Sequence, residues 1–159
     1  MKGEKKISSD TPLFEITLRK YEKPQAKKER ELVKRLCLSL GVLQPGDSRD
    51  VIVDVLHVLL KSRKKKQLMS IEDIEKKVII NRKLHKLQQQ GIAASNIRRQ
   101  IKRMRNLMLV EKLKSRYRIS EFLDASEIFS EKIEKFLLQG IIQRVKEYLS
   151  AADDLFSRK

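Results

Sequence analysis

Residues that form covalent or metal cross-links are almost absent from this chain. One cysteine, Cys37, and two histidines occur among its 159 residues. A lone cysteine excludes an intrachain disulfide and a site built from several thiolates of one chain. The two histidines, His57 and His85, have no metal-ligand spacing around them, so we interpret them as packing or solvated side chains. We therefore expect no metal and no cofactor.

Turn formers, aromatic residues and long apolar runs are also scarce. The chain has five Gly, three Pro, no Trp and 5% aromatics, but much Lys, Glu, Leu and Ile, which favours helices over a β-sandwich or barrel. No apolar run approaches the roughly 18 residues that span a bilayer. The N-terminus has no signal-type apolar core. We expect no membrane partner and a cytoplasmic location at the nucleoid, or a nuclear one in a eukaryote.

Motifs of catalysis are missing as well. The sequence contains no Gly-rich phosphate loop, no nucleophile elbow and no paired-carboxylate motif. Its Ser and Asp residues stand mostly at expected helix caps and turns, where they have a structural use. These observations predict a binding protein rather than an enzyme.

Positive charge is in large excess and is concentrated in one part of the chain. The net charge is +16. Residues 61–120 hold 19 Lys and Arg against 4 Asp and Glu, whereas residues 1–60 hold 12 against 9 and residues 121–159 hold 6 against 8. An indifferent basic surface would spread more evenly, so this concentration favours a binding face for a polyanion. The basic run 61–66 is either a solvated helix end or a phosphate contact.

Apolar residues at helical spacing predict an N-terminal helix and a central one. The first covers about 25–40, with Gly41 as its C-terminal cap. After a turn, Asp47 or Ser48 caps the next helix, at about 49–64. That helix is apolar on nearly every face, which places it in the middle of the fold.

The clearest helical pattern lies in the basic region, at Ser95–Leu107, where Ser95 serves as the cap. Its apolar residues step by four, three and four along one narrow stripe: Ile97, Ile101, Met104 and Met108. At about 100° per residue, polar side chains fall on the opposite face: Ser95, Arg99, Lys102, Arg103 and Asn106, with Arg98 and Arg105 at the flanks. This helix therefore has a buried side and a cationic side.

Two short strands, at 108–113 and 116–120, follow the basic helix and are joined by a tight turn at Lys114-Ser115. With this order of elements, residues 47–120, under half of the chain, resemble the winged helix-turn-helix family. The segment SNIRRQIKRMRNLMLVEKLKSRYRIS is similar to that family's recognition helix and wing. The resemblance implies a helix in the major groove of DNA and a hairpin on the backbone or the adjacent minor groove. We thus expect a mainly α fold: a three-helix core plus a two-stranded wing, with an N-terminal helix and C-terminal amphipathic helices.

The family usually joins its second and third helices by a short turn, and here the chain departs from that pattern. The second helix begins at Ser70, where Ser-Ile-Glu-Asp has the spacing of a capping box. Its apolar period breaks near 80–81 and restarts weakly before Gly91. Either the helix is 70–79 and 81–90 is an inserted helical segment, or 81–90 is itself the helix before the turn.

The side chains of the basic helix suit contacts with DNA. Arg and Lys donate to base edges in the major groove and Asn pairs with adenine. We assign base contacts to the outward face: Arg99, Lys102, Arg103 and Asn106. Phosphate contacts, which set the register without reading sequence, are assigned to the surrounding cations: Arg98, Arg105, Lys112, Lys114 and Arg116. Ser95 and Asn96 complete the predicted DNA-binding set.

From Ser126 onward, a three–four repeat of apolar residues predicts a helical tail. This stripe either folds back over the winged domain or pairs with a second chain, and its length and lost positive charge favour pairing. Gly140 is the main argument against one long straight helix. The predicted dimer interface is Phe129, Ile133, Phe136, Leu137, Ile141, Val145 and Tyr148. We divide the chain into a flexible arm (1–24), a winged-helix domain with its leading helix (25–120) and a helical dimerisation segment (121–159).

These features predict a sequence-specific, dimeric double-stranded DNA-binding protein that regulates transcription. One alternative is a winged-helix protein–protein adaptor, because a fold does not fix a function. Another is a non-specific nucleic-acid binder, of either an architectural or an RNA-binding type. Single-stranded RNA is the weaker candidate, because Tyr117 is the one aromatic stacking platform in the basic region.

Overall fold

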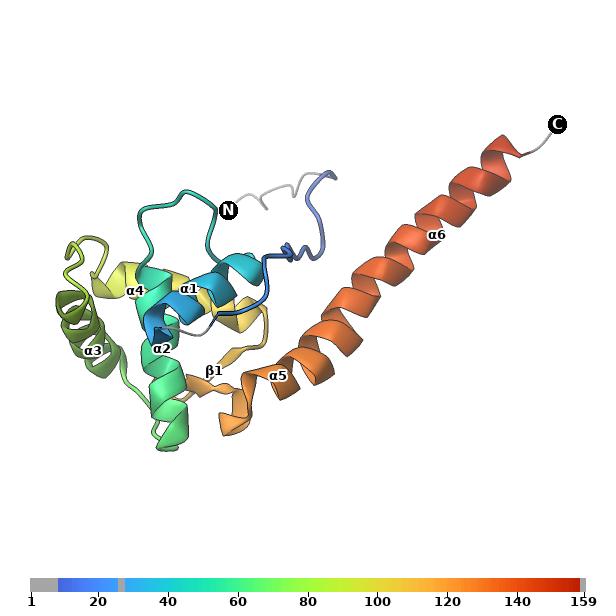
Figure 1. The fold of residues 1–159 in the computed structure, drawn as a ribbon. Coiled ribbons are helices and arrows are strands. Elements are labelled where there is room, and N and C mark those ends of the chain that lie inside the picture. The colour runs from blue at the N-terminus through green and yellow to red at the C-terminus, as the bar shows by residue number, and fades with distance from the viewer. Residues whose placement is uncertain (1–8, 26–27, 158–159) are drawn as a thin grey trace, which may run out of the picture.

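Within residues 9–25 and 28–157, which this computed structural model describes, the chain is mainly helical with one small antiparallel sheet (Figure 1). The start of the predicted arm, at 1–8, lies outside the described residues. In chain order the elements are α1 (Glu29–Ser39), α2 (Val51–Lys64), α3 (Ile71–Leu84), α4 (Ala94–Asn106), β1 (Val110–Leu113), β2 (Arg116–Ile119), η1 (Ser120–Phe122), α5 (Ala125–Ile128), the π-helical η2 (Phe129–Leu138) and α6 (Gln139–Phe156).

Helix α2 is the centre of the fold, as its all-round apolar sequence predicts. It packs against α1, α3, α4 and β2, and Val53, Val55 and Leu56 have no exposed surface. Because neighbouring elements cover this helix on several sides, apolar residues are favourable on nearly every face.

Helix α1 ends in the glycine cap that the sequence predicts. Gly41 has a φ of +72°. Its N–H donates to the carbonyl of Leu38, and the N–H of Val42 donates to the carbonyl of Cys37. This pair of bonds satisfies two carbonyls that the helix would otherwise leave open at its end.

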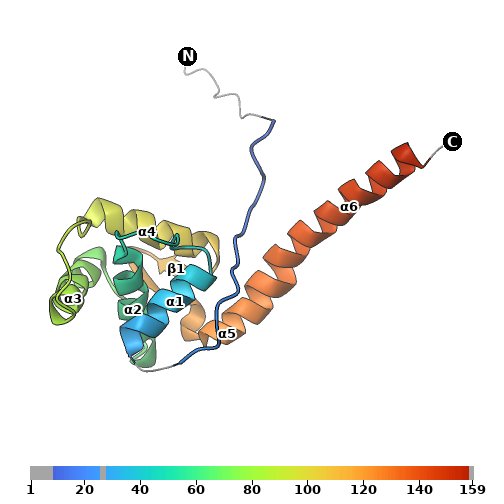
Figure 2. The ribbon, with the colours of Figure 1, turned by 45° about the horizontal axis from the view of Figure 1, so that its top comes forward.

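Part of the predicted flexible arm is attached to this helix end. The Arg19 N–H donates to the Ser39 carbonyl at 2.9 Å, and its guanidinium donates to the Leu38 carbonyl at 3.1 Å. A Cβ on Gly41 would lie 2.0 Å from the carbonyl oxygen of Thr17. The chain around these residues therefore crosses closely over the end of α1 on an extended course (Figure 2).

The N-cap predicted for α2 is wrong, and the one predicted for α3 is confirmed. Helix α2 begins after Asp50, not after Asp47 or Ser48, and the Asp50 carboxylate bonds to arginines of α1 and α3 instead of capping its own helix. At α3, Ser70 Oγ accepts from the Asp73 N–H at 3.1 Å, and the Ser70 N–H donates to the Asp73 carboxylate at 3.4 Å. These two reciprocal bonds between Ser70 and Asp73 form a capping box.

Helix α3 runs unbroken through the point where its apolar period fails, so neither alternative for 81–90 is correct. Residues 85–93 form no helix. The helix continues because Asn81 and Arg82 face inward: the Asn81 amide donates to Asp54 at 2.8 Å, and Arg82 donates to the same carboxylate at 2.7 Å. The apolar period of α3 breaks at Asn81 and Arg82 because these side chains bond to the buried Asp54 carboxylate instead of packing against apolar groups.

The predicted hairpin is confirmed, with its turn at Lys114-Ser115. Strands β1 and β2 pair antiparallel, and Val110 lies opposite Ile119. Met69, in the α2–α3 linker, adds a bridge: its N–H donates to the Tyr117 carbonyl at 2.9 Å, and the Tyr117 N–H donates back at 2.8 Å. The hairpin is therefore fastened to the linker.

The C-terminal part of the chain forms one long rod that leaves the body (Figures 1 and 2). It comprises α5, η2 and α6 and passes Gly140 without interruption. Ile133 is 1% exposed and Phe129 packs against the core, whereas α6 contains no buried residue. Ile133 is therefore a core residue of its own chain and not the dimer-interface residue that the sequence predicts, and Phe129 is partly buried against the same core. None of the described helices combines the length and apolar character needed to cross a membrane.

Candidate nucleic-acid interface

The buried side of α4 is the stripe that the sequence predicts, except for its last member. Ile97, Ile101 and Met104 are at most 1% exposed, and the helix packs against α2, α3 and β1. Met108 lies beyond the helix end, at a φ of +62°, and is 36% exposed. The three buried residues fix how the helix is rotated on the body.

The opposite side of α4 is open to solvent and carries positive charge. The helix starts after Ala93 without a side-chain cap, so Ser95 lies in the first turn and is not the predicted cap. Six predicted residues of this side are exposed: Ser95, Arg98, Arg99, Lys102, Arg105 and Asn106. None of the four cations among them forms an ion pair with a described residue. Their charge is therefore available to a polyanion.

Asn96 and Arg103 lie on a flank of α4 that is partly covered. A chain of hydrogen bonds joins this flank: the Asn96 amide donates to the Gly91 carbonyl at 2.6 Å, and the Gln100 amide donates to Asn96 Oδ1 at 3.0 Å. Arg103, which is half-buried, donates to Gln100 Oε1 at 3.3 Å. Asn96 thus holds the turn into α4, and Arg103 is turned away from the outermost line of the helix.

The hairpin brings three further predicted residues to the surface. Lys112, Lys114 and Arg116 are exposed. Arg116 lies near the start of α3: hydrogen bonds with Ser70, and more weakly the charge of Arg116, lower the pKa of Asp73. We name the exposed cations and Asn106 of α4 together with these hairpin residues the α4–hairpin surface: Arg98, Arg99, Lys102, Arg105, Asn106, Lys112, Lys114 and Arg116.

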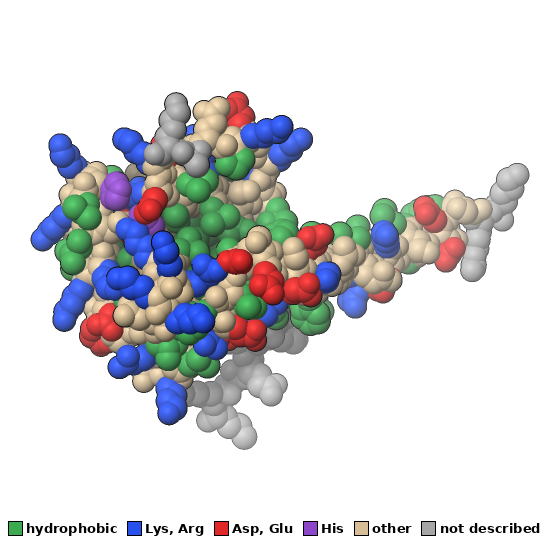
Figure 3. Space-filling model, turned by 60° about the horizontal axis from the view of Figure 1, so that its bottom comes forward, with side chains coloured by type: hydrophobic (Ala, Val, Ile, Leu, Met, Phe, Trp, Pro, Cys, Tyr) green, Lys and Arg blue, Asp and Glu red, His purple; other side chains and the backbone are tan. Residues whose placement is uncertain are grey.

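Positive charge is not confined to this surface. Figure 3 shows one face of the molecule, on which Lys and Arg side chains are spread over the body and acidic side chains gather where the body meets the projecting rod. In the basic run 61–66, Arg63 has a structural contact, because it donates to the Leu123 carbonyl at 2.6 Å and pairs with Asp124. Lys64, Lys65 and Lys66 are exposed.

A buried network of four charges fixes α1, α2 and α3 relative to one another. Asp54 is fully buried and accepts from Arg30 Nε at 3.0 Å and from Arg82 Nη1 at 2.7 Å. Asp50 accepts from the same two arginines, at 3.1 and 3.0 Å. Burial alone would raise the pKa of Asp50, but hydrogen bonds and charges from the arginines hold it below its usual value. Arg82 Nε also donates to the Gln88 carbonyl at 2.7 Å and so fixes the α3–α4 connection.

His57 extends this network toward solvent. Its Nε2 lies 3.1 Å from Glu29 Oε2, and its Nδ1 lies 3.2 Å from the Asn81 amide nitrogen. Burial is the main cause that lowers the pKa of His57. A neutral ring can accept from Asn81 and donate to Glu29 at once. Among the described residues, no group of three or more His, Cys, Asp or Glu could hold a metal ion.

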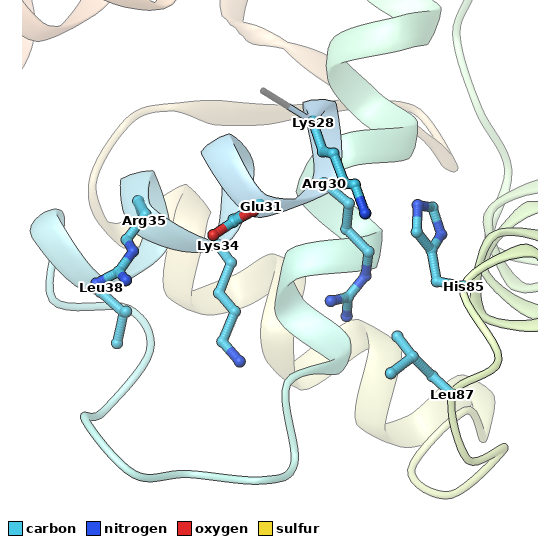
Figure 4. Close-up of a pocket in the computed structure, with 8 residues that line it drawn as sticks. All are labelled: Lys28, Arg30, Glu31, Lys34, Arg35, Leu38, His85 and Leu87. Atoms are coloured by element: carbon cyan, nitrogen blue, oxygen red, sulfur yellow. The ribbon is translucent and has the colours of Figure 1, made fainter. Parts of the chain in front are cut away.

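A cavity of about 470 Å³ lies beside the network, between α1 and the α3–α4 connection (Figure 4). Figure 4 shows Arg30 on one side and His85 and Leu87 on the other. Arg30 is already bonded to both carboxylates, and Lys34 Nζ lies 3.8 Å from Asp50. Arg30 and Lys34 are thus engaged by the buried acids, and the other cations of the lining, Lys28 and Arg35, stand beside Glu31.

Sequence patterns do not reveal the network, because its partners are 20 to 32 positions apart. The one local signal is Asp54, which interrupts an otherwise apolar helix. No family model, curated protein or solved structure matches this chain. Its own geometry therefore has to support any functional conclusion.

Proposed function

We propose that this protein binds double-stranded DNA through the α4–hairpin surface, with α4 in the major groove and the hairpin on the backbone. One observation carries the proposal: α4 combines a fully buried apolar stripe with an opposite side of exposed cations that have no acidic partner among the described residues. The major groove, about 12 Å wide, admits one α-helix of about that diameter. Along its outermost line, Arg99, Lys102 and Asn106 offer donors to base edges.

The order of elements supports a winged helix-turn-helix architecture. Helices α2, α3 and α4 form the three-helix core, and the hairpin follows α4 directly. The connection 85–93 is longer than the usual turn, but it is held at both ends. Arg82 binds the Gln88 carbonyl at one end, and Asn96 binds the Gly91 carbonyl at the other. The longer connection therefore leaves α4 well positioned.

The projecting helix α6 supports a homodimer. Its apolar side chains are exposed, from 37% at Ile142 through 52% at Val145 and 59% at Leu149 to 83% at Phe156. Together with Ala152 they recur at intervals of three and four, which is the seam of a two-helix coiled coil. Of the predicted interface, Val145 belongs to this seam. Ile141 and Tyr148 each precede a member of the seam by one position, and Phe136 and Leu137 lie before α6, in η2. Such a dimer presents two copies of α4 to successive major grooves, as transcriptional regulators at the nucleoid or in a nucleus do.

Selection of duplexes from a random DNA library by the purified full chain tests this proposal. We expect enrichment of one sequence, with a palindromic arrangement. Arg99→Ala or Lys102→Ala should relax the preference at one position, by about 1–3 kcal/mol per lost base contact. Lys114→Ala, the matched control, should weaken binding to all duplexes equally.

The other outcomes of this experiment identify the alternatives. Equal losses on every sequence for all three variants would indicate a non-specific architectural binder. Preference for RNA over a duplex of equal length would overturn the choice of nucleic acid. Absence of duplex binding at low salt would overturn the proposal and favour a protein adaptor, for which the exposed apolar side of α6 is the supporting observation.

A further inference from the structure

A second segment of the chain borders the α4–hairpin surface. A cavity of about 470 Å³ lies between the covered flank of α4 and the α1–α2 loop. Its floor is apolar, formed by Leu43 and Ile52, which are 2% and 1% exposed. Three arginines line it: Arg49 from the loop, and Arg99 and Arg103 from α4.

The polar lining of this cavity suits an anion. It contains one acid, Asp47, whose carboxylate already accepts the backbone N–H of Arg49 at 2.9 Å. Neutral amides complete the wall: Gln90, Asn96 and Gln100. Guanidinium groups bind phosphate oxygens in a planar, bidentate manner, and amide NH₂ groups add donors.

The arginines of this cavity differ in their pairing from Arg30, the buried arginine beside the cavity of Figure 4. There, the buried arginine is bonded to two carboxylates. Here, Arg49 and Arg99 form no ion pair with any residue that the structure describes, and Arg103 bonds to the neutral Gln100. An incoming phosphate would therefore meet guanidinium groups that no carboxylate of the described chain has neutralised.

We infer that this cavity receives a phosphate group of the DNA backbone, with Arg49 and Arg103 as its principal ligands. The inference rests on the proposed function, because Arg99 belongs both to this cavity and to the outward side of α4. A strand that follows α4 passes the cavity. Arg103 is then a phosphate contact and not the base contact that the sequence predicts, because it is half-buried on the flank. Arg49, which no sequence pattern singles out, joins the interface.

The salt dependence of DNA binding tests the role of Arg49. Arg49→Ala removes an exposed side chain from a loop, and Arg144→Ala removes the same charge from the distant α6. For the full chain and one selected duplex, we expect Arg49→Ala to bind about tenfold more weakly. The slope of log K against log salt should fall by about one. Arg144→Ala should change neither quantity, and unchanged melting temperatures will verify the fold of both variants.

Neutral methylphosphonates, placed at one backbone position at a time, identify the phosphate itself. At the position that the cavity receives, neutralisation should weaken the wild type but leave Arg49→Ala unchanged, because that contact is already lost. Two results together would overturn the backbone assignment: AMP raises the melting temperature of the wild type, and the wild type and Arg49→Ala have equal salt slopes. The cavity would then bind a free nucleotide.

The two proposals fail in different ways. A wild-type protein that binds no duplex at low salt refutes the proposed function. A wild-type protein that binds DNA with the same salt slope as Arg49→Ala refutes the phosphate assignment alone.

Discussion

Buried charges determine how the helices beneath α4 are placed. Asp50 and Asp54 share two arginines, so two negative and two positive charges are enclosed together. Such a network adds little net stability relative to apolar packing, but the removal of one partner leaves a buried charge uncompensated. The network joins three helices and the α3–α4 connection, and it therefore specifies geometry more than it adds stability.

Asp54→Asn tests this role, because it keeps the shape of the side chain and removes its charge. Two guanidinium groups, both on buried residues, would then share one carboxylate. We expect the free energy of unfolding to fall by about 3–5 kcal/mol, measured by urea denaturation. Asp154→Asn, on the exposed side of α6, should change it by less than about 0.5 kcal/mol. Similar values for the two variants would contradict a structural role for the network.

The same residues show the limit of prediction from sequence. Periodicity identifies Ile97, Ile101 and Met104 as core because each is apolar and correctly spaced. It misreads the end of α3, since Asn81 and Arg82 are polar and nevertheless face inward. The partner that makes this favourable, Asp54, is 27 positions from Asn81. Patterns within a single helix carry no information about contacts at such a separation.

At the scale of elements, the N-terminal arm passes close to the end of α1. Substitutions at two glycines distinguish the cost of this close contact from the cost of backbone strain. Gly41 and Gly46 both have a positive φ, +72° and +77°. A Cβ at Gly46 would meet nothing within 4 Å, whereas one at Gly41 would meet the Thr17 carbonyl. Gly46→Ala therefore measures the backbone strain alone, and Gly41→Ala adds displacement of the arm.

We expect Gly46→Ala to lower the free energy of unfolding by about 1–2 kcal/mol. Gly41→Ala should cost at least about 1 kcal/mol more, as overpacking typically does, in the same urea titration. It should also speed proteolysis near Arg19, because the arm is no longer held against α1. Equal losses and equal cleavage rates would show that the arm contributes nothing to the fold.

Helix boundaries divide into those that local chemistry decides and those that it does not. Gly41 and the Ser70 capping box are correctly predicted, because both signals act within four residues. The start of α2 is mispredicted. Ser48 is a residue type that often caps helices, but the helix begins after Asp50, whose carboxylate bonds to arginines far away in the sequence. Ile133 is misassigned for a related reason. One apolar period runs from the body contact into the projecting rod, and the sequence contains no mark where the body ends.

At the scale of the whole molecule, a basic body carries a projecting amphipathic helix, α6. Helix α6 has 18 residues and so extends about 27 Å. The large apolar side chains that it leaves in water add no burial energy to the isolated helix, and short helices are marginal without packing. In the proposed dimer, a second copy of α6 would bury this seam, which holds no charged residue.

Leu149→Asp tests the dimer, because it places a charge in the middle of the seam. We expect the wild type to sediment as a dimer at micromolar concentration and Leu149→Asp to sediment as a monomer. The melting temperature of the body should stay the same, since no residue of α6 is buried within one chain. Ser150→Asp adds the same charge beside the seam and should remain dimeric. On DNA, Leu149→Asp should lose affinity for a duplex with two half-sites and keep its affinity for a single half-site, because each α4 acts alone there. A wild-type monomer would refute the dimer, and a Leu149→Asp dimer would show that the seam of α6 is not its interface.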